Sequence, residues 1–236
     1  MNLKLHHFFI LTNPGGSAGD QLLAMGFKEA ESRTHSGQGT VNRRFYMADG
    51  IMLELLWVGD VEESSNGPAR DLRFQERSIS DQASPFGLIF SPKNNDLQDA
   101  HTVPFAGWSY QPEYFSPPMA FHVGENSTML NEPLCIYAPF FKPVGNESGK
   151  DRKGEKLERS KKVNEINGKT VTEIRITVPG GKFSPVLESA KETSGLTIQE
   201  GDRHLMEVFF ELENIDDGVN NNVKDLRPDL PLVIYV

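Results

Sequence analysis

Several features that mark other protein classes are scarce in this 236-residue sequence. Its single cysteine, Cys135, excludes an internal disulfide and favours a reducing, cytoplasmic location. No apolar run approaches the roughly 20 residues of a membrane-spanning helix, so no membrane partner is expected. The 24 Lys and Arg are outnumbered by 33 Asp and Glu, and the resulting net charge of -9 argues against nucleic acid as a partner.

Signatures of several enzyme classes are also missing. The sequence has no phosphate-binding P-loop and no Cys or His spacing of the zinc-finger kind. Cys135 lies in the apolar stretch PLCIYAPF and is expected to be a small core residue, not a nucleophile. The opening MNLKLHHFFILT has one Lys and no small-residue cleavage site behind it, which predicts a first strand and not a signal peptide.

The first sixty residues have the clearest pattern, and their predicted order is β-α-β-β-β. A strand over 3–12 ends at the turn NPGG, and Ser17 is expected to cap a helix through AGDQLLAM that Gly26 ends. Two further strands are predicted at FKEAESRT and VNRRFYMA. The turn Asp49-Gly50 then leads into the apolar strand IMLELLWV.

The rest of the chain is predicted to complete one domain over 1–236. Residues 61–143 read as an irregular segment with strands at PFGLIFS, PPMAFHVG and PLCIYAPFF and a short helix near NNDLQDAH. Residues 144–164 are almost free of apolar side chains and are expected to form a flexible polar loop. Residues 165–236 echo the opening, with TEIRITVPGG, a helix through FSPVLESAKETSGL and the strand HLMEVFFELE.

The first-strand His, the stretch SRTHSGQGTVN and the strand DGIMLELLWV resemble the vicinal oxygen chelate superfamily, and more narrowly its glyoxalase-like proteins. The resemblance implies an α+β fold in which paired βαβββ modules, here 1–60 and 165–236, form a cup-shaped, mostly antiparallel sheet. Its cup commonly holds a divalent metal. Members include lactoylglutathione lyases, extradiol dioxygenases, epimerases and antibiotic-binding proteins without catalysis, so the fold leaves the chemistry open.

Two adjacent histidines open the first strand. Side chains alternate between the faces of a strand, so His7 shares a face with Phe9 and Leu11, while His6 lies on the other. The first-strand metal ligand of the resembled family falls on His7, which implies that His7 faces the cup and His6 sits at the rim. The alternative for either residue is a partly exposed, hydrogen-bonded histidine.

Glu54 interrupts an otherwise apolar strand. Burying a lone carboxylate is costly, so Glu54 is expected to have a metal, an Arg or a shared proton as partner. The fourth-strand ligand of the resembled family falls on this position. The alternative is a structural pair with Arg43 or Arg44 on the neighbouring strand.

A third metal ligand is sought in the strand PMAFHVG. Met119, Phe121 and Val123 form its apolar face, so His122 points the other way, into the cup by this interpretation. His7, Glu54 and His122 would make a set that suits Zn, Fe, Mn or Ni, and no organic cofactor is predicted. Glu207 occupies the place of Glu54 in the C-terminal echo, and either carboxylate could serve as the proton-transfer base.

The strand VNRRFYM suggests residues for the substrate. If Val41, Arg43, Phe45 and Met47 pack under the helix, the opposite set lines the cup: Asn42, Arg44 and Tyr46. An Arg in the cup would suit a carboxylate, enolate or phosphate group, although pairing with a surface acid is the alternative.

Three functions are compatible with these patterns. The first is a metal-dependent lyase, isomerase or dioxygenase that polarises the oxygens of a small substrate. The second is a protein that binds or sequesters a small molecule in the same cup without metal. The third is a structural domain whose cup is filled by its own side chains. A small-molecule ligand is the expected partner, and a homodimer is compatible with the sequence.

Overall fold

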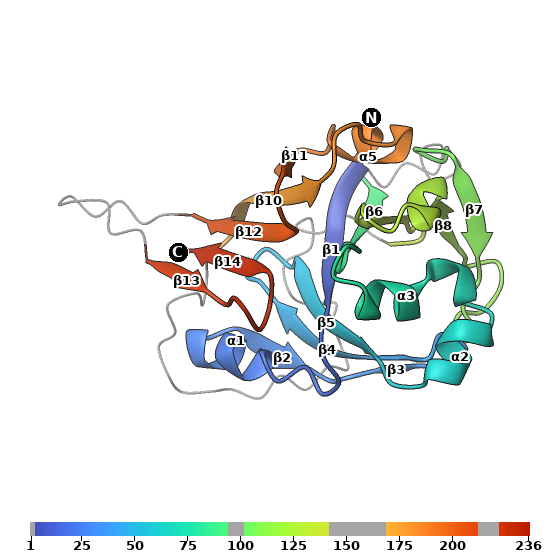
Figure 1. Ribbon diagram of the computed structural model, residues 1–236, viewed down its shortest axis with the longest axis horizontal. Coiled ribbons are helices and arrows are strands. Elements are labelled where there is room, and N and C mark those ends of the chain that lie inside the picture. The colour runs from blue at the N-terminus through green and yellow to red at the C-terminus, as the bar shows by residue number, and fades with distance from the viewer. Residues whose placement is uncertain (1–2, 94–101, 142–168, 212–221) are drawn as a thin grey trace.

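The computed structural model describes residues 3–93, 102–141, 169–211 and 222–236, and their strands form two sheets (Figure 1). The larger has nine strands in the order β2-β4-β5-β1-β6-β9-β8-β7, with β3 paired to β4. The smaller has five strands in the order β11-β10-β12-β14-β13. Most strand pairs of the larger sheet are antiparallel.

The first module matches the order predicted from the sequence. Its elements are β1 (Leu3–Leu11), α1 (Gly19–Met25), β2 (Lys28–Ala30), β3 (Thr34–His35), β4 (Thr40–Tyr46) and β5 (Met52–Val58). The last strand returns beside the first, since β1 and β5 are parallel. Gly26 ends α1 at φ 100°, a conformation that favours glycine. The expected Ser17 cap is wrong, because Ala18 is the N-cap residue and no side chain caps this helix.

A second module with the same strand order follows in the middle of the chain. Its strands are β6 (Phe86–Pro92), β7 (Gly107–Tyr110), β8 (Phe121–Gly124) and β9 (Leu134–Tyr137). Here too the last strand, β9, returns parallel to the first, β6, and the other pairs are antiparallel. The prediction that 61–143 is irregular is therefore wrong. Three of its strands fall on the stretches predicted as strands, PFGLIFS, PPMAFHVG and PLCIYAPFF, whereas β7 was not predicted.

The C-terminal segment is not the second module, contrary to the prediction for 165–236. Its elements are β10 (Val171–Pro179), α5 (Pro185–Ala190), β11 (Leu196–Gly201), β12 (Leu205–Phe210), β13 (Val223–Asp225) and β14 (Leu232–Tyr235). In the first module, the first strand β1 lies beside the last strand, β5. In the C-terminal segment, the first strand β10 lies between β11 and β12 and is not beside the last strand, β14. The echo of the opening is local, because a strand, a Pro-Gly-Gly turn and a helix do not decide which strands pair. The paired-module, cupped fold itself is confirmed by the two modules of the larger sheet.

Short helices join the two modules: α2 (Val61–Asn66), η1 (Arg70–Leu72) and α3 (Phe74–Ile79). The sequence reading missed them, because each has only one or two turns. The helix expected near NNDLQDAH and the polar segment 144–164 lie outside the described residues. Among the described helices, none is long and apolar enough to cross a membrane.

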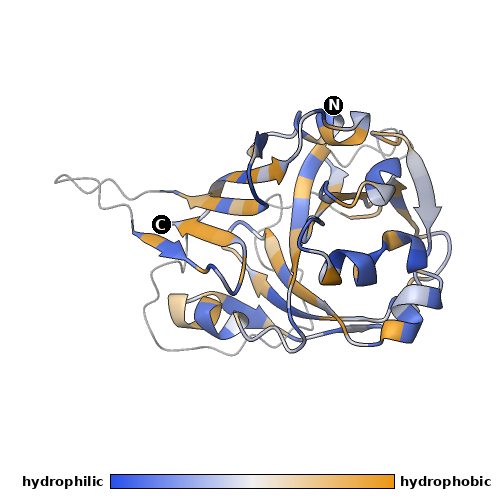
Figure 2. Ribbon diagram, viewed as in Figure 1, coloured by the Kyte–Doolittle hydropathy of each residue, from blue (hydrophilic) through white to orange (hydrophobic). Residues whose placement is uncertain are grey.

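The two faces of the larger sheet pack against different partners. On β1, Phe8 and Ile10 belong to a core shared with α1, α5 and the five-stranded sheet. Phe9 and Leu11 belong to a second core on the other face, together with Leu72 and other residues of the connecting helices. Figure 2 shows the apolar colouring of β14, a buried strand within the smaller sheet. The first core holds the sheets together, and the second lies on the side of the cup.

Arg77 on α3 is a buried cation that ties the loop before β9 to the connecting helices. Its side chain is 2% exposed. It donates hydrogen bonds to five backbone carbonyls, those of Ser84, Ser127, Met129, Leu130 and Glu132. The Glu132 carboxylate in turn accepts bonds from the Ser184 backbone N–H at 2.7 Å and from its hydroxyl at 2.6 Å. Ser184 caps α5, so this network links the larger sheet to the C-terminal segment.

We predict that Arg77→Ala destabilises the protein strongly. The substitution leaves buried carbonyls without donors, so we expect the free energy of unfolding to fall by about 3 kcal/mol or more. Urea denaturation followed by circular dichroism measures this change. Arg70→Ala is the matched control, because the Arg70 side chain is 58% exposed. Equal effects of the two substitutions would contradict the role assigned to Arg77.

Candidate functional site

The concave face of the larger sheet encloses a cavity of about 480 Å³. Its walls come from both modules and from the helices between them. The residues that line it include His6, His7, Phe9, Arg33, His35, Gln38, Arg44, Tyr46, Glu54, Phe74, Ile89, Tyr110, Tyr114, Phe115, Phe121, Ile136 and Phe141. A cavity of this size suits a small organic molecule.

Contacts between distant parts of the sheet show how strongly it curves. Tyr114 follows β7 in the second module, whereas Gln38 precedes β4 in the first. The Tyr114 hydroxyl nevertheless donates a hydrogen bond to Gln38 Oε1 at 3.1 Å. The Tyr114 ring also lies 5.5 Å from the ring of His35, measured between centroids. The opposite ends of the sheet therefore meet across the cavity, which makes it a cup.

Both histidines of β1 line this cavity. His7 is 8% exposed, and burial is the main cause that lowers its pKa well below the usual range. The Nδ1 atoms of His6 and His7 lie 2.8 Å apart, so one ring donates an N–H hydrogen bond to the other. The prediction that His6 points away from the cup is wrong. The β1–β6 pairing shifts register between Leu5 and His7, and this irregularity breaks the alternation at His6.

Glu54 also lines the cavity, on β5 beside β1 and opposite Arg44 of β4. Burial raises the pKa of its carboxyl group to about 7, although the charge of Arg44 opposes the shift. Such a carboxyl group can accept or release a proton near neutral pH. The neighbouring Arg44 also fits the alternative of a pair between Glu54 and an arginine.

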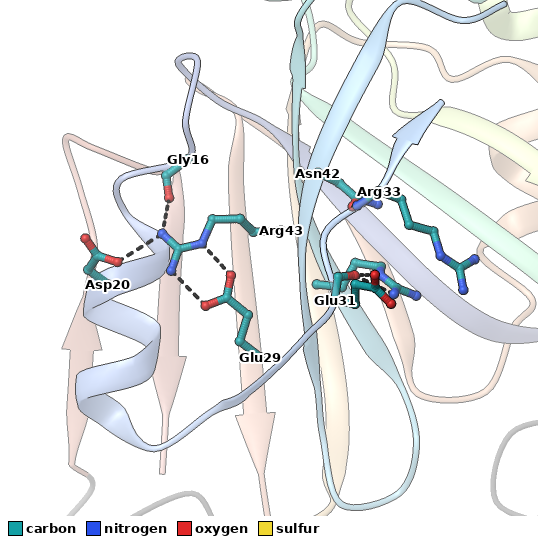
Figure 3. A network of polar contacts seen from close by, with 8 residues as sticks. Gly16, Asp20, Glu29, Glu31, Arg33, Asn42 and Arg43 are labelled. Carbon is teal, nitrogen blue, oxygen red and sulfur yellow. Dashed lines mark hydrogen bonds and ion pairs between the residues drawn. The ribbon is translucent and has the colours of Figure 1, made fainter. Parts of the chain in front are cut away.

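The β4 residues divide between the two faces of the sheet as predicted, with one exception. Arg44 and Tyr46 line the cavity, and Arg44 is 3% exposed, with Nε and Nη2 donating to the Glu31 carbonyl. Arg43 lies on the other face, bonded to Glu29, Asp20 and the Gly16 carbonyl (Figure 3).

Asn42 is the exception among the predicted substrate residues. It is fully buried, and its Oδ1 accepts a hydrogen bond from the Arg33 backbone N–H at 2.8 Å, the contact drawn in Figure 3. It is not among the residues that line the cavity. Asn42 therefore holds the segment before β3 that carries Arg33, and a hydrogen bond from its side chain to Glu54, which lines the cavity, works against the raised pKa of that carboxyl group.

His122 and Glu207 do not reach the cavity, contrary to prediction. His122 Nε2 lies 2.8 Å from the Phe105 carbonyl, and Phe105 belongs to the core between the sheets. The apolar face of β8, which includes Phe121, is the one that lines the cup. Glu207 lies on β12 in the other sheet, where its carboxylate accepts a bond from the Tyr235 hydroxyl at 2.9 Å.

The residues of the cup do not fit a three-ligand metal centre. The two central strands of the first module contribute His6, His7 and Glu54 to the cavity, whereas those of the second contribute Ile89 and Ile136. Isoleucine has no atom that can bind a metal. Within the part of the chain that the structure describes, no group of three His, Cys, Asp or Glu side chains could hold an ion. The predicted set of His7, Glu54 and His122 is therefore wrong.

Aromatic residues of the second module are the part of the site that sequence reasoning missed. Tyr110, Tyr114, Phe115, Phe121 and Phe141 line the cavity. Three of them, Tyr110, Tyr114 and Phe115, lie in the aromatic run PFAGWSYQPEYFSPP. Two of the five rings contact the polar wall, since Phe141 lies 4.4 Å from His6 and Tyr114 lies 5.5 Å from His35 between ring centroids, and open space remains beside them. His35 was also missed; its pKa is lowered to about 4, mainly by burial.

Gly87 leaves room for the Phe9 ring at the floor of the cup. Gly87 on β6 lies opposite Phe9 on β1. A Cβ atom at Gly87 would lie 1.9 Å from Phe9 Cε1, far inside van der Waals contact. The absent side chain therefore makes room for the Phe9 ring, which lines the cavity. Cys135 lies on the other face, fully buried, and burial raises its pKa to about 12, as befits a core residue.

We predict that Glu54→Gln stabilises the protein in a pH-dependent way. The folded-state pKa of about 7 exceeds the usual 4.5, so wild-type stability falls as pH rises from 4.5 to 7. The shift corresponds to a loss of roughly 3 kcal/mol in the free energy of unfolding of the wild type at pH 8, and the Gln variant should avoid this loss. Below about pH 4.5 both states carry a protonated Glu54, and the difference should vanish. Urea titrations at pH 4 and pH 8 measure the difference in the free energy of unfolding between the variant and the wild type, with Glu207→Gln as control. If this difference is the same at both pH values, Glu54 does not have the raised pKa.

Comparisons with known proteins return structural likenesses only. No family model matches the chain, and no curated protein matches it in sequence. A methylmalonyl-CoA epimerase bound to methylmalonyl-CoA aligns with a TM-score of 0.38 and 11% identity, over 61% of this chain and 99% of the epimerase. A mutant 4-hydroxymandelate synthase from Streptomyces coelicolor aligns with a TM-score of 0.44 and 8% identity. That alignment covers 98% of this chain but 61% of the synthase. At these scores neither likeness bears on the activity of this chain, whose cupped fold rests on its own strand order.

Proposed function

We propose that the cup binds a small planar organic molecule without a resident metal ion. The observation that carries this proposal is the division of the lining between the modules. Polar groups of the first module, including His7, Arg44 and Glu54, face aromatic rings of the second across about 480 Å³. A ligand with one polar and one aromatic end would satisfy both walls.

Ring geometry on the aromatic side supports a planar ligand. Phe121 lies within 5.3 Å of Phe115 and 6.1 Å of Phe141, between ring centroids, in tilted and edge-on arrangements. Tyr110 and Phe121 are nearly parallel, with centroids 6.5 Å apart. Offset and edge-to-face contacts of this kind are favourable between aromatic rings, and a planar ligand can extend them.

Catalysis is the narrower form of this proposal. Glu54 stays a candidate for the proton-transfer base, because its carboxyl group faces the cavity with a pKa of about 7. Glu207 is no longer a candidate, since it lies on the other sheet. A lyase, isomerase or dioxygenase that needs a three-ligand metal centre is not supported by the lining residues.

We predict that filling the cavity abolishes ligand binding. Ile89 is 4% exposed and lines the cup, so Ile89→Phe places extra volume where the ligand would lie. A fragment screen of planar aromatic compounds by NMR should find binders to the wild type that lose at least about tenfold in affinity with the variant. Ile79→Phe makes the same change at a side chain that is 71% exposed, and should bind as the wild type does. A screen without binders would refute the proposal.

We also predict that the purified protein carries little metal. A stable site takes three or four protein ligands, and the described residues of the cup include no group of three His, Cys, Asp or Glu side chains placed to hold an ion. Elemental analysis of protein prepared without chelator should find Zn, Fe, Mn and Ni well below about one equivalent per chain. Near-stoichiometric metal that is lost in Glu54→Gln would restore the metal-dependent hypothesis.

A further inference from the structure

We propose that Tyr110 recognises the ligand of the cup by donating a hydrogen bond from its hydroxyl group to a neutral carbonyl oxygen on that ligand. The inference rests on the proposed function, and it names a binding residue and the chemical class of the ligand, an aromatic carbonyl compound. It is drawn from a buried hydroxyl group that has no hydrogen-bond partner among the described residues, although its ring lines the cavity.

The strand β7 places Tyr110 on the aromatic wall of the cup. β7 is an edge strand of the larger sheet (Figure 1), and its Tyr110 pairs with Phe121 of β8. Both residues line the cavity, and their rings are nearly parallel. Tyr110 is 4% exposed and belongs to the core on the concave side of the sheet. Its ring therefore carries the hydroxyl group to the side of the cup and away from bulk water.

The hydroxyl group of Tyr110 differs from those of two other tyrosines in its lack of a partner. It is buried and makes no hydrogen bond to the part of the chain that the structure describes. Tyr114 donates to Gln38 Oε1 at 3.1 Å, and Tyr235 donates to Glu207 at 2.9 Å. A buried donor without an acceptor costs free energy, so such groups are uncommon and call for an explanation. An acceptor on a ligand in the adjoining cavity would remove this cost.

The surroundings of this hydroxyl group favour a neutral acceptor. Burial, followed by the charges of Glu113 and Glu63, raises the pKa of Tyr110 to about 12, so the group keeps its proton at neutral pH and can donate it in a hydrogen bond. The same two carboxylates would repel an anionic acceptor at this place. A carbonyl oxygen accepts hydrogen bonds without carrying a charge. Attached to an aromatic ring, it leaves the planar contacts with the aromatic wall in place.

Two probes of nearly equal shape test this hydrogen bond. Acetophenone carries a carbonyl group where α-methylstyrene carries a methylene group on the same ring. In NMR titrations of the full chain, Tyr110→Phe should weaken the binding of acetophenone at least about fivefold and leave that of α-methylstyrene unchanged, because only the donor is lost. Tyr235→Phe is the matched control. It removes a hydroxyl group from the smaller sheet, so the affinities for both probes should stay as in the wild type.

The stability of the ligand-free protein gives a second test. Removal of a buried hydroxyl group that has no partner relieves an uncompensated cost, so Tyr110→Phe should raise the urea midpoint. Tyr114→Phe should lower the midpoint, since it leaves the oxygen of the buried Gln38 side chain without its donor. Urea titrations followed by circular dichroism compare the two variants. A lower midpoint in both would mean that the Tyr110 hydroxyl group is already satisfied, and the inference would be overturned.

The outcomes separate this inference from the proposed function. If Tyr110→Phe changes the affinities for both probes equally, or changes neither, the inference is overturned while the cup remains a binding site. The same holds if Tyr235→Phe weakens acetophenone as much as Tyr110→Phe does. If neither probe binds but other planar fragments do, the inference also fails alone. Failure of every planar fragment overturns the proposed function as well.

Discussion

The antiparallel pairing of β1 with β6 is the interaction on which the site depends. It joins the two modules into one sheet and brings the central strands of both to the floor of one cup. Its register sets His7 against Ile89 and Phe9 against Gly87. A shift by one residue would turn these side chains to the opposite face. The polar and aromatic walls would then have no common cavity.

The second sheet makes this arrangement compatible with a stable core. A sheet that is apolar on both faces must be covered on both. The connecting helices cover part of the concave face, and the five-stranded sheet with α1 and α5 covers the convex one. The buried Arg77 and Glu132 bind these layers through hydrogen bonds. The space left open on the concave face is therefore a feature of the fold and not a defect of packing.

The sequence predicted the first module well, because β1, β4 and β5 have seven to nine residues and a clear alternation or apolar run. It also singled out Glu54 correctly as a carboxyl group in need of a partner. It found three strands of the second module but missed β7 and the organisation of these strands as a module, and it mistook a local echo at the C-terminus for that module. Which strands pair is decided by contacts far apart in the chain, and a local pattern carries little information about them.

The failure at His122 has a more specific cause. The prediction placed the polar side of β8 toward the cup, whereas Phe121 of β8 lines the cup and the wall on that side is aromatic. The same assumption worked for β4, because Arg44 and Tyr46 belong to the polar wall. Whether a cup-facing residue is polar thus depends on which module it comes from. The irregular pairing at His6 shows a second limit, because one bulge breaks the alternation on which the prediction relied.

The close approach of the Phe9 ring to Gly87 has a consequence for how this site can change over evolutionary time. Because a Cβ atom at Gly87 would collide with that ring, a larger residue at 87 can be accepted only together with a smaller one at 9. The two positions should therefore vary in a correlated manner among homologous sequences. Through this pair, a glycine that touches no ligand limits the size of the ring at the floor of the cup.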